Sequence, residues 1–222
     1  MEIGGTSDLP PWPLFIGFYT PEYKEEAEGL IATLRQFNLP FQIQAQISMG
    51  SWWLNTQLKA IVIQEFMEKH PNQPIVYIDC DARVRQTPTL LRHLPDRCDF
   101  AAHYRDDSRS HLFHDGRELL SGTLFFSGSP TCKRFVDLWV HENEVRARES
   151  RQTPGYDPTK LMDQRTLQAV VERLTETDRQ YLRMEELPAT YVQIFDTMRD
   201  AGQPVIEHMQ ASRRLRRTIS PD

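Results

Sequence analysis

The sequence predicts an α/β domain in which helices flank a mostly parallel central sheet. Apolar runs at residues 14–20 and 74–79 are typical of buried strands, and the polar alternation at 41–47 predicts another strand. Between these runs, apolar residues recur at three- and four-residue spacing over 22–37 and 55–70, which predicts two helices. The resulting β-α-β-α-β order favours right-handed crossovers and parallel strands.

The second half of the chain continues with shorter elements. We expect further strands at residues 99–103, 120–127 and 191–195, and further helices at residues 130–148 and 162–174. The inward side chains of the first of these helices are predicted to be Phe135, Leu138 and Trp139. The second helix is predicted to have Asp163 as its N-cap or to begin just before it.

Four segments have no predicted regular structure. Residues 1–13 are rich in proline and form an irregular lead, and residues 204–222 form a C-terminal segment. The polar stretches at 105–118 and 149–160 are predicted to be mobile loops, and α/β folds often carry functional residues on such loops.

The bulk properties fit one ordinary globular domain over residues 1–222. The formal charge of −5 gives no overall field that would attract nucleic acid. No apolar run approaches the roughly 20 residues that span a bilayer, and the N-terminus lacks a signal-peptide pattern. The three cysteines are widely spaced and predict neither a disulfide framework nor a zinc site. We therefore expect a soluble, cytoplasmic protein without a membrane partner.

Two carboxylates, Asp79 and Asp81, follow the strand predicted at 74–79. In extended backbone, residues two apart point the same way, so both side chains can face one point. Their mutual repulsion favours a divalent cation, and hard oxygen ligands suit Mg²⁺ or Mn²⁺. The carboxyl end of a central strand is also the usual ligand crevice of open α/β sheets. The pair therefore predicts a metal site, although a cap followed by a polar turn is the simpler alternative.

The segment 75–82, Ile-Val-Tyr-Ile-Asp-Cys-Asp-Ala, resembles the hydrophobic-Asp-x-Asp segment of GT-A glycosyltransferases. The pattern is similar to the glycogenin and bacterial galactosyltransferase types and to the nucleotide-diphospho-sugar transferases. The resemblance covers the chain from Phe15 to Arg214. It consists of short motifs in the same order and not of close sequence identity. The resemblance implies a Rossmann-like GT-A domain that binds a nucleotide-sugar, with a UDP-sugar as the expected donor, through Mn²⁺ or Mg²⁺.

Two motifs in the first quarter of the chain match the nucleotide side of that family. Tyr19 and Thr20 end the segment that resembles the family's first strand, which contacts the nucleotide base. Asn55 and Lys59 stand four apart where the family has a helix start that contacts base, ribose and donor, so they share a helix face. The charge of Lys59 would favour either the diphosphate or a carboxylate that orients the sugar.

Two later motifs match the sugar and acceptor side. Gly122 and Thr123 lie in a segment that resembles the strand lining the acceptor, where glycine allows close approach to the backbone or marks a bulge. Asp163 and Gln164 resemble the family's Asp-Gln pair facing the sugar. Asp163 is expected to act as general base if the reaction inverts the anomeric centre. If the reaction retains configuration, Asp163 or Gln164 is expected to orient the sugar or stabilise the transition state.

The C-terminal segment resembles the part of the family that completes the metal site. His208 matches its third metal ligand. The family then has a small residue at the third position and a lysine at the sixth, where this chain has Ala211 and Arg214. The resemblance therefore implies that Arg214 binds the diphosphate, for which a guanidinium is well suited.

These features predict a metal-dependent glycosyltransferase that moves a sugar from a nucleotide-sugar to an acceptor hydroxyl on a saccharide, a protein or a modified DNA base. One alternative is a phage-type enzyme acting on a hydroxymethylated base in DNA, favoured by the arginine-rich tail and opposed by the net charge. Another is a nucleotidyltransferase or a non-catalytic nucleotide-binding module. Nucleotidyltransferases usually carry a glycine-rich loop after the first strand, and residues 20–23 contain no glycine.

Overall fold

The computed structural model describes residues 9–106 and 117–219. The strands are β1 Leu14–Tyr19, β2 Phe41–Ala45, β3 Ile75–Ile78, β4 Ala82–Val84, β5 Phe100–Asp106, β6 Arg117–Phe126, β7 Met184–Glu186, β8 Gln193–Ile194 and β9 Ile206–His208. The α-helices are α1 Lys24–Gln36, α2 Trp52–Lys69, α3 Pro130–Gln152, α4 Asp163–Arg173, α5 Glu176–Tyr181 and α6 Ser212–Ile219. Short 3-10 helices include η1 Pro21–Tyr23, η4 Pro158–Leu161 and η5 Ala189–Tyr191.

A central sheet of six strands has the order β2-β1-β3-β6-β5-β7. The pairs β1/β2, β1/β3 and β5/β7 are parallel, and β6 runs antiparallel to both of its neighbours. The predicted α/β class with a mostly parallel sheet is therefore confirmed. A second sheet of three strands, β4-β9-β8, lies beside it.

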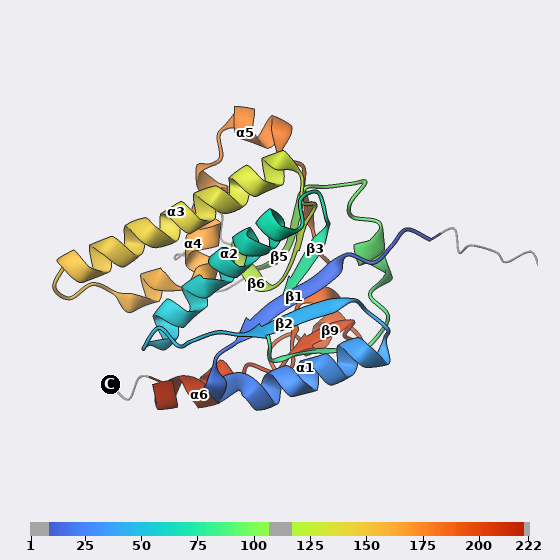
Figure 1. Ribbon diagram of the computed structural model, residues 1–222, viewed down its shortest axis with the longest axis horizontal. Helices are drawn as coiled ribbons and strands as arrows, with labels where there is room; N and C mark the ends of the chain where they lie inside the picture. Colours follow the sequence, from blue (N-terminus) through green and yellow to red (C-terminus); the bar gives the residue numbers. More distant parts are fainter. Residues whose placement is uncertain (1–8, 107–116, 220–222) are drawn as a thin grey trace, which may run out of the picture.

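Alternation along the strands divides the core into two apolar layers. Ile75 and Tyr77 of β3 face the layer that contains residues of α2, α3 and α4. Val76 and Ile78 face the opposite layer, which contains residues of α1, β4 and β9. Figure 1 shows the same arrangement, with α2, α3 and α4 on one side of the sheet and α1 on the other. All four residues of β3 are buried, as expected for a strand covered on both faces.

Local signals explain where the helices begin and end. The Ser51 hydroxyl accepts a hydrogen bond from the Leu54 amide at the start of α2, and the Ser129 hydroxyl does the same for Cys132 in α3. Asn38, with φ of 51°, ends the turn after α1 and directs the chain into β2.

Some sequence predictions were wrong in detail. Leu138 is 49% exposed and does not point inward, unlike its neighbour Trp139. Of the two starts expected for α4, the second is found, because Met162 is the N-cap and Asp163 is the first helical residue. The strand predicted at 191–195 is only the two-residue β8, preceded by η5. The loop predicted at 105–118 falls largely on residues 107–116, outside the described residues.

The C-terminal segment contains regular structure that the sequence pattern did not predict. β9 pairs antiparallel with β4 and parallel with β8, and α6 follows it. Figure 1 shows α6 beside the start of α1. Through this pairing, β9 near the C-terminus lies against β4, which follows β3 in the sequence. In the part of the chain that is described, no helix combines the length and the apolar character that crossing a membrane requires.

Candidate active site

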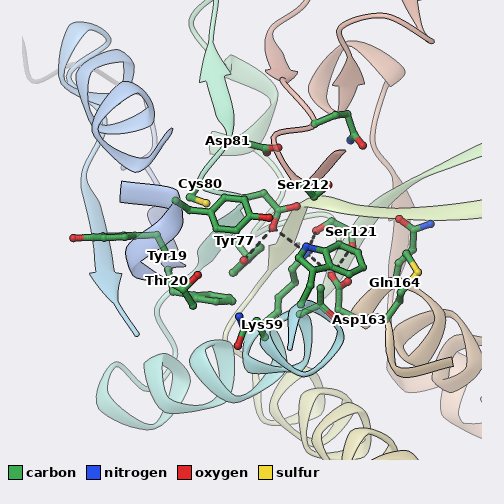
Figure 2. Close-up of a pocket in the computed structure, with 18 residues that line it drawn as sticks. Tyr19, Thr20, Lys59, Tyr77, Cys80, Asp81, Ser121, Asp163, Gln164 and Ser212 are labelled. Carbon is green, nitrogen blue, oxygen red and sulfur yellow. Dashed lines mark hydrogen bonds and ion pairs between the residues drawn. The ribbon is translucent and has the colours of Figure 1, made fainter. Parts of the chain in front are cut away.

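A pocket opens beyond the carboxyl ends of β1 and β3, where the first turns of α2 and α4 also meet (Figure 2). Its empty space, including the open mouth, is about 900 Å³. The described residues that line it are Phe18, Tyr19, Thr20, Tyr23, Trp52, Asn55, Thr56, Lys59, Tyr77, Asp79, Cys80, Asp81, Ser121, Met162, Asp163, Gln164, Gln210 and Ser212. The location agrees with the ligand crevice expected for an open α/β sheet.

Three side chains that can ligate a metal lie together beside the pocket, and two of them, Asp79 and Asp81, line it. Asp79, Asp81 and His208 each offer one ligand atom, and these atoms lie within 4.8 Å of one another. The β4/β9 register sets Ala82 opposite His208, which places the histidine beside Asp81. The backbone holds the contact, because Met209 N–H donates to the Asp81 carbonyl at 3.2 Å and Ala211 N–H donates to Asp81 Oδ2 at 2.8 Å.

The free atoms of this cluster suit one divalent cation. Asp81 Oδ1 lies 3.8 Å from His208 Nδ1. Two donors that each bind one ion at about 2.1 Å lie up to about 4.2 Å apart, so this spacing fits a shared metal. Oδ2 of Asp79 has no hydrogen-bond partner among the described residues, since Tyr77 and Lys59 both contact Oδ1. Two oxygens and one imidazole nitrogen are a donor set that fits Mn²⁺ better than Ca²⁺.

His208 is supported from β6. Its Nε2 lies 2.9 Å from the hydroxyl of the fully buried Thr123. When Nε2 carries the proton and donates to this hydroxyl, Nδ1 keeps a lone pair on the side of Asp81. A Cβ atom at Gly122 would lie 2.7 Å from Cε1 of the imidazole. The close approach that glycine allows here is therefore that of a protein side chain, and the histidine packs directly on the strand backbone.

The two aspartates differ in their electrostatic surroundings. Burial alone would raise the pKa of Asp81, but the adjacent His208 and the Ala211 N–H hold it below its ordinary value. Burial raises the pKa of Asp79, and the charges of Asp163 and Asp81 raise it further against the lowering effect of Lys59. A bound cation would favour the charged form of both.

Lys59 joins this cluster to Asp163. Its ammonium group lies 3.0 Å from Asp79 Oδ1 and forms an ion pair with Asp163 Oδ2. It also donates to the Ser121 carbonyl at 2.9 Å, and the Ser121 hydroxyl donates to Asp163 Oδ2 at 2.7 Å. Figure 2 shows Lys59 rising from α2 between these groups. The sequence suggested either the diphosphate or a carboxylate as the partner of Lys59. In the structure its charged partners are the carboxylates of Asp79 and Asp163.

The lysine is charged despite its burial. Only 3% of Lys59 is exposed. Burial would lower its pKa, but the carboxylates of Asp163 and Asp79 raise the pKa above its ordinary value. Tyr77 contributes in two ways, because its hydroxyl donates to Asp79 Oδ1 at 3.1 Å and its ring centroid lies 4.9 Å from the ammonium nitrogen.

Ser121 and Tyr77 are site residues that the sequence interpretation did not single out. Both stand two residues from a predicted one in a strand, Ser121 before Thr123 and Tyr77 before Asp79. The period of two could have indicated them, since alternate strand residues share a face. Their contacts with Lys59 depend on the pairing of distant segments, which the sequence pattern does not specify.

The sugar-side glutamine has a defined partner. Gln164 Nε2 donates to Glu118 Oε1 at 2.6 Å, and Glu118 also pairs with Arg105. The neighbouring Asp163 N–H donates to the Thr56 hydroxyl at 3.3 Å, which ties the start of α4 to α2.

The residues predicted on the nucleotide side line the opposite wall. Tyr19 is the last residue of β1, Thr20 follows it directly, and Asn55 lies in the first turn of α2. Asn55 Oδ1 accepts the Met49 N–H at 2.6 Å and its amide donates to the Ser48 hydroxyl at 3.1 Å. The asparagine therefore also fixes the segment between β2 and α2.

Known structures share this architecture, although no protein-family model matches the sequence and no curated protein is significantly similar to it. A glycosyltransferase involved in glycosylation of the major capsid of PBCV-1 aligns over 96% of this chain and 100% of its own, with 11% identity and a TM-score of 0.61. The fold is that of a GT-A glycosyltransferase.

Two larger glycosyltransferases share the GT-A fold of this chain. The bifunctional enzyme WbbM in its apo form aligns over 94% of this chain and 47% of its own, with 12% identity and a TM-score of 0.52. GlyE from Streptococcus pneumoniae TIGR4 aligns over 89% and 54%, with 14% identity and a TM-score of 0.53. This chain thus spans about half the length of those two structures.

Four predicted residues are absent from the described lining of the pocket: Gly122, Thr123, His208 and Arg214. Gly122 and Thr123 of β6 lie against the imidazole of His208 and do not line the pocket. Arg214 is not brought to the pocket either, because its guanidinium is 65% exposed and lies 2.9 Å from Glu26 of α1. Ser212 and Gln210 are the residues of the C-terminal segment that line the pocket.

Proposed function

We propose that this chain is one GT-A domain over residues 1–222 that transfers a sugar from a nucleoside-diphosphate sugar to an acceptor hydroxyl with a divalent metal. The observation that carries the proposal is the convergence of ligand atoms of Asp79, Asp81 and His208 within 4.8 Å, with Asp79 and Asp81 lining the pocket. The GT-A fold and the adjoining Lys59–Asp163 pair support it.

The charge of the pocket favours metal dependence. Asp79, Asp81 and Asp163 oppose Lys59, the only permanently positive side chain among the described residues that line the pocket. Without a metal, the carboxylates of the pocket would repel a diphosphate, because the positive charge of Lys59 is already paired with two of them. Mn²⁺ or Mg²⁺ held by Asp79, Asp81 and His208 would neutralise charge on the leaving diphosphate. The residues themselves hold and orient the cation, with His208 oriented in turn by Thr123.

The nucleotide is proposed to bind along Tyr19, Thr20, Asn55 and the aromatic Trp52. Each of these residues lines the pocket on the side of β1 and α2. An aromatic ring such as that of Trp52 can stack on a nucleotide base, and polar side chains can form hydrogen bonds with the base edges and the ribose. A uridine nucleotide is the donor class implied by the family resemblance, and the sugar would then lie toward Asp163 and Gln164.

Asp163 is proposed to orient the sugar and not to act as a general base. Its Oδ2 is held by the Lys59 ammonium and accepts the Ser121 hydroxyl at 2.7 Å. It is only 6% exposed, so it has little freedom to swing toward an acceptor. A carboxylate held in this way stabilises positive charge that develops on the sugar, through its position and negative charge.

Among the tail side chains that the structure describes, nothing specifically supports the DNA-directed alternative. Of the tail arginines, Arg213 pairs with Asp196 and Arg214 pairs with Glu26. Both charges are therefore balanced by acids, whereas binding to duplex phosphates needs unpaired cations along a groove. The nucleotidyltransferase and binding-module alternatives do not explain the buried Lys59–Asp163–Ser121 arrangement beside the metal ligands.

A thermal-shift panel tests the proposal. We expect a uridine diphosphate sugar to raise the melting temperature in the presence of Mn²⁺, because a ligand that binds only the folded state stabilises it. The variant Asp81→Asn should lose the metal-dependent part of this shift. Asp200→Asn, which changes an exposed acid in the 3-10 helix Arg199–Ala201 and outside the pocket lining, is the matched control and should keep it. Equal shifts with and without Mn²⁺, or none with any nucleotide-sugar, would contradict the proposal.

A further inference from the structure

Gln164 is held by an acid that does not itself line the pocket. Its Nε2 donates to Glu118 Oε1 at 2.6 Å, across the contact between α4 and β6. The other oxygen of Glu118 accepts from Arg105 of the neighbouring strand β5. The Glu118 side chain is 15% exposed and that of Arg105 is 22% exposed, so water competes little for these contacts.

This arrangement fixes which end of the carboxamide faces the pocket. The amide oxygen and nitrogen of a glutamine are distinguished by their partners, and an ionised carboxylate can only accept hydrogen bonds. Both oxygens of Glu118 act as acceptors, one for the Arg105 guanidinium and the other for Gln164. The nitrogen of Gln164 must therefore face Glu118. Oε1 is left without a hydrogen-bond partner among the described residues, while the side chain lines the pocket (Figure 2).

We propose that Glu118 is a positioning residue that holds the Gln164 oxygen toward the donor sugar as a hydrogen-bond acceptor. The inference rests on the proposed glycosyl transfer, and it specifies the chemistry of the sugar subsite. A sugar hydroxyl at this place donates to Oε1. A sugar that lacks a hydroxyl there leaves the oxygen unpaired in a partly buried site, which costs affinity.

The variant Glu118→Gln tests the inference while preserving the shape of residue 118. A glutamine at 118 can donate as well as accept, so it no longer dictates the orientation of Gln164. We expect the kcat/KM for UDP release from the best of UDP-glucose, UDP-galactose and UDP-N-acetylglucosamine to fall about 10- to 100-fold. The affinity for UDP alone with Mn²⁺ should not change, because UDP lacks the donor sugar that Gln164 is proposed to contact. The differences in kcat/KM among the three donors should become smaller.

A matched control lies on the same helix. Gln168 Nε2 donates to Glu172 Oε1 at 3.0 Å, which is the same pair of chemical groups. Neither residue lines the pocket of the candidate active site. Glu172→Gln should therefore leave kcat/KM and donor preference as they are in the wild type.

A double-mutant cycle separates positioning from a general effect on the fold. Once Gln164→Ala has removed the carboxamide, adding Glu118→Gln should change kcat/KM no further. Additive effects, or an unchanged donor preference in Glu118→Gln, would overturn the inference. If Glu118→Gln weakens UDP binding as much as turnover, its role is structural and the inference also fails. A wild-type protein that releases no UDP from any of the three donors would instead contradict the proposed function.

Discussion

The ammonium nitrogen of Lys59 lies 3.0 Å from Oδ1 of Asp79. Through this contact and its ion pair with Asp163, the lysine links the proposed metal site to the proposed sugar site. A lysine that is 3% exposed between two carboxylates is costly to desolvate, and its partners offset that cost only while all three are present.

Removing the charge of Lys59 should destabilise the fold. We expect Lys59→Met to lower the free energy of unfolding by about 3 kcal/mol or more, because Asp79 and Asp163 are left without their cation. Urea denaturation measures the change. Lys69→Met on the same helix breaks an exposed pair with Glu65 and should cost less than about 0.5 kcal/mol. Equal losses in the two variants would show that the buried cluster is not stabilising.

Removing the hydroxyl of Thr123 should weaken metal binding without touching a ligand. Thr123→Val keeps the shape of the side chain but leaves His208 Nε2 without its 2.9 Å partner. We expect Mn²⁺ affinity, measured by calorimetry or by the free Mn²⁺ resonance signal, to fall about tenfold. Thr33→Val also loses a hydrogen-bonding hydroxyl, in α1, and should leave Mn²⁺ affinity unchanged. Unaltered affinity in Thr123→Val would argue against His208 as a ligand.

The position of Arg214 leads to a prediction that differs from the sequence-based one. Because its guanidinium pairs with Glu26 at the surface, we expect Arg214→Ala to leave the Mn²⁺-dependent affinity for UDP nearly unchanged. Its cost in stability should stay below about 1 kcal/mol, as for other exposed ion pairs. A large loss of UDP affinity would mean that Arg214 leaves Glu26 and binds the diphosphate, as the family resemblance implied.

Asp99 should contribute a pH-dependent part of the stability. Burial would raise its pKa, but hydrogen bonds from Arg183, Ser129 and Ser127 hold the pKa below the ordinary value of 3.8. Since the folded-state pKa is depressed, this stability is present in full above the unfolded pKa and is lost as pH falls through the folded pKa. We expect Asp99→Asn to cost about 2 kcal/mol at pH 7.

The pH series provides the check on Asp99. The difference in unfolding free energy between wild type and Asp99→Asn should shrink as the pH is lowered below 3.8, the ordinary pKa of an aspartate. A difference that stays constant from pH 7 to the acid limit would indicate lost packing and not lost charge.

The fold class was predictable because the strands and helices are strongly patterned. The buried runs at β1 and β3 and the periodic residues of α1 and α2 are local signals, and each predicted one element. Asp79 and Asp81 were predictable as a pair because they follow β3 directly. The resemblance to the family, and not the pattern, indicated His208.

Contacts that depend on distant pairing were not predictable. The β4/β9 register decides that His208 meets Asp81, and no local pattern specifies it. Lys59 and Asp163 are far apart in the sequence, so only the packing of α2 on α4 determines that their charges meet. Leu138 was misplaced because a mixed polar and apolar helix such as α3 leaves the inward face uncertain by one residue.

The most direct test of the proposed metal-dependent glycosyl transfer is the rate of UDP release from a UDP-sugar, with and without Mn²⁺, in wild type and Asp81→Asn. Asp81 sits between His208 and the backbone of Ala211, so the substitution removes a ligand charge with little change of shape. We predict release that requires Mn²⁺ in the wild type and falls by at least about 100-fold in the variant. Equal release from both proteins, or release that ignores Mn²⁺, would contradict the account.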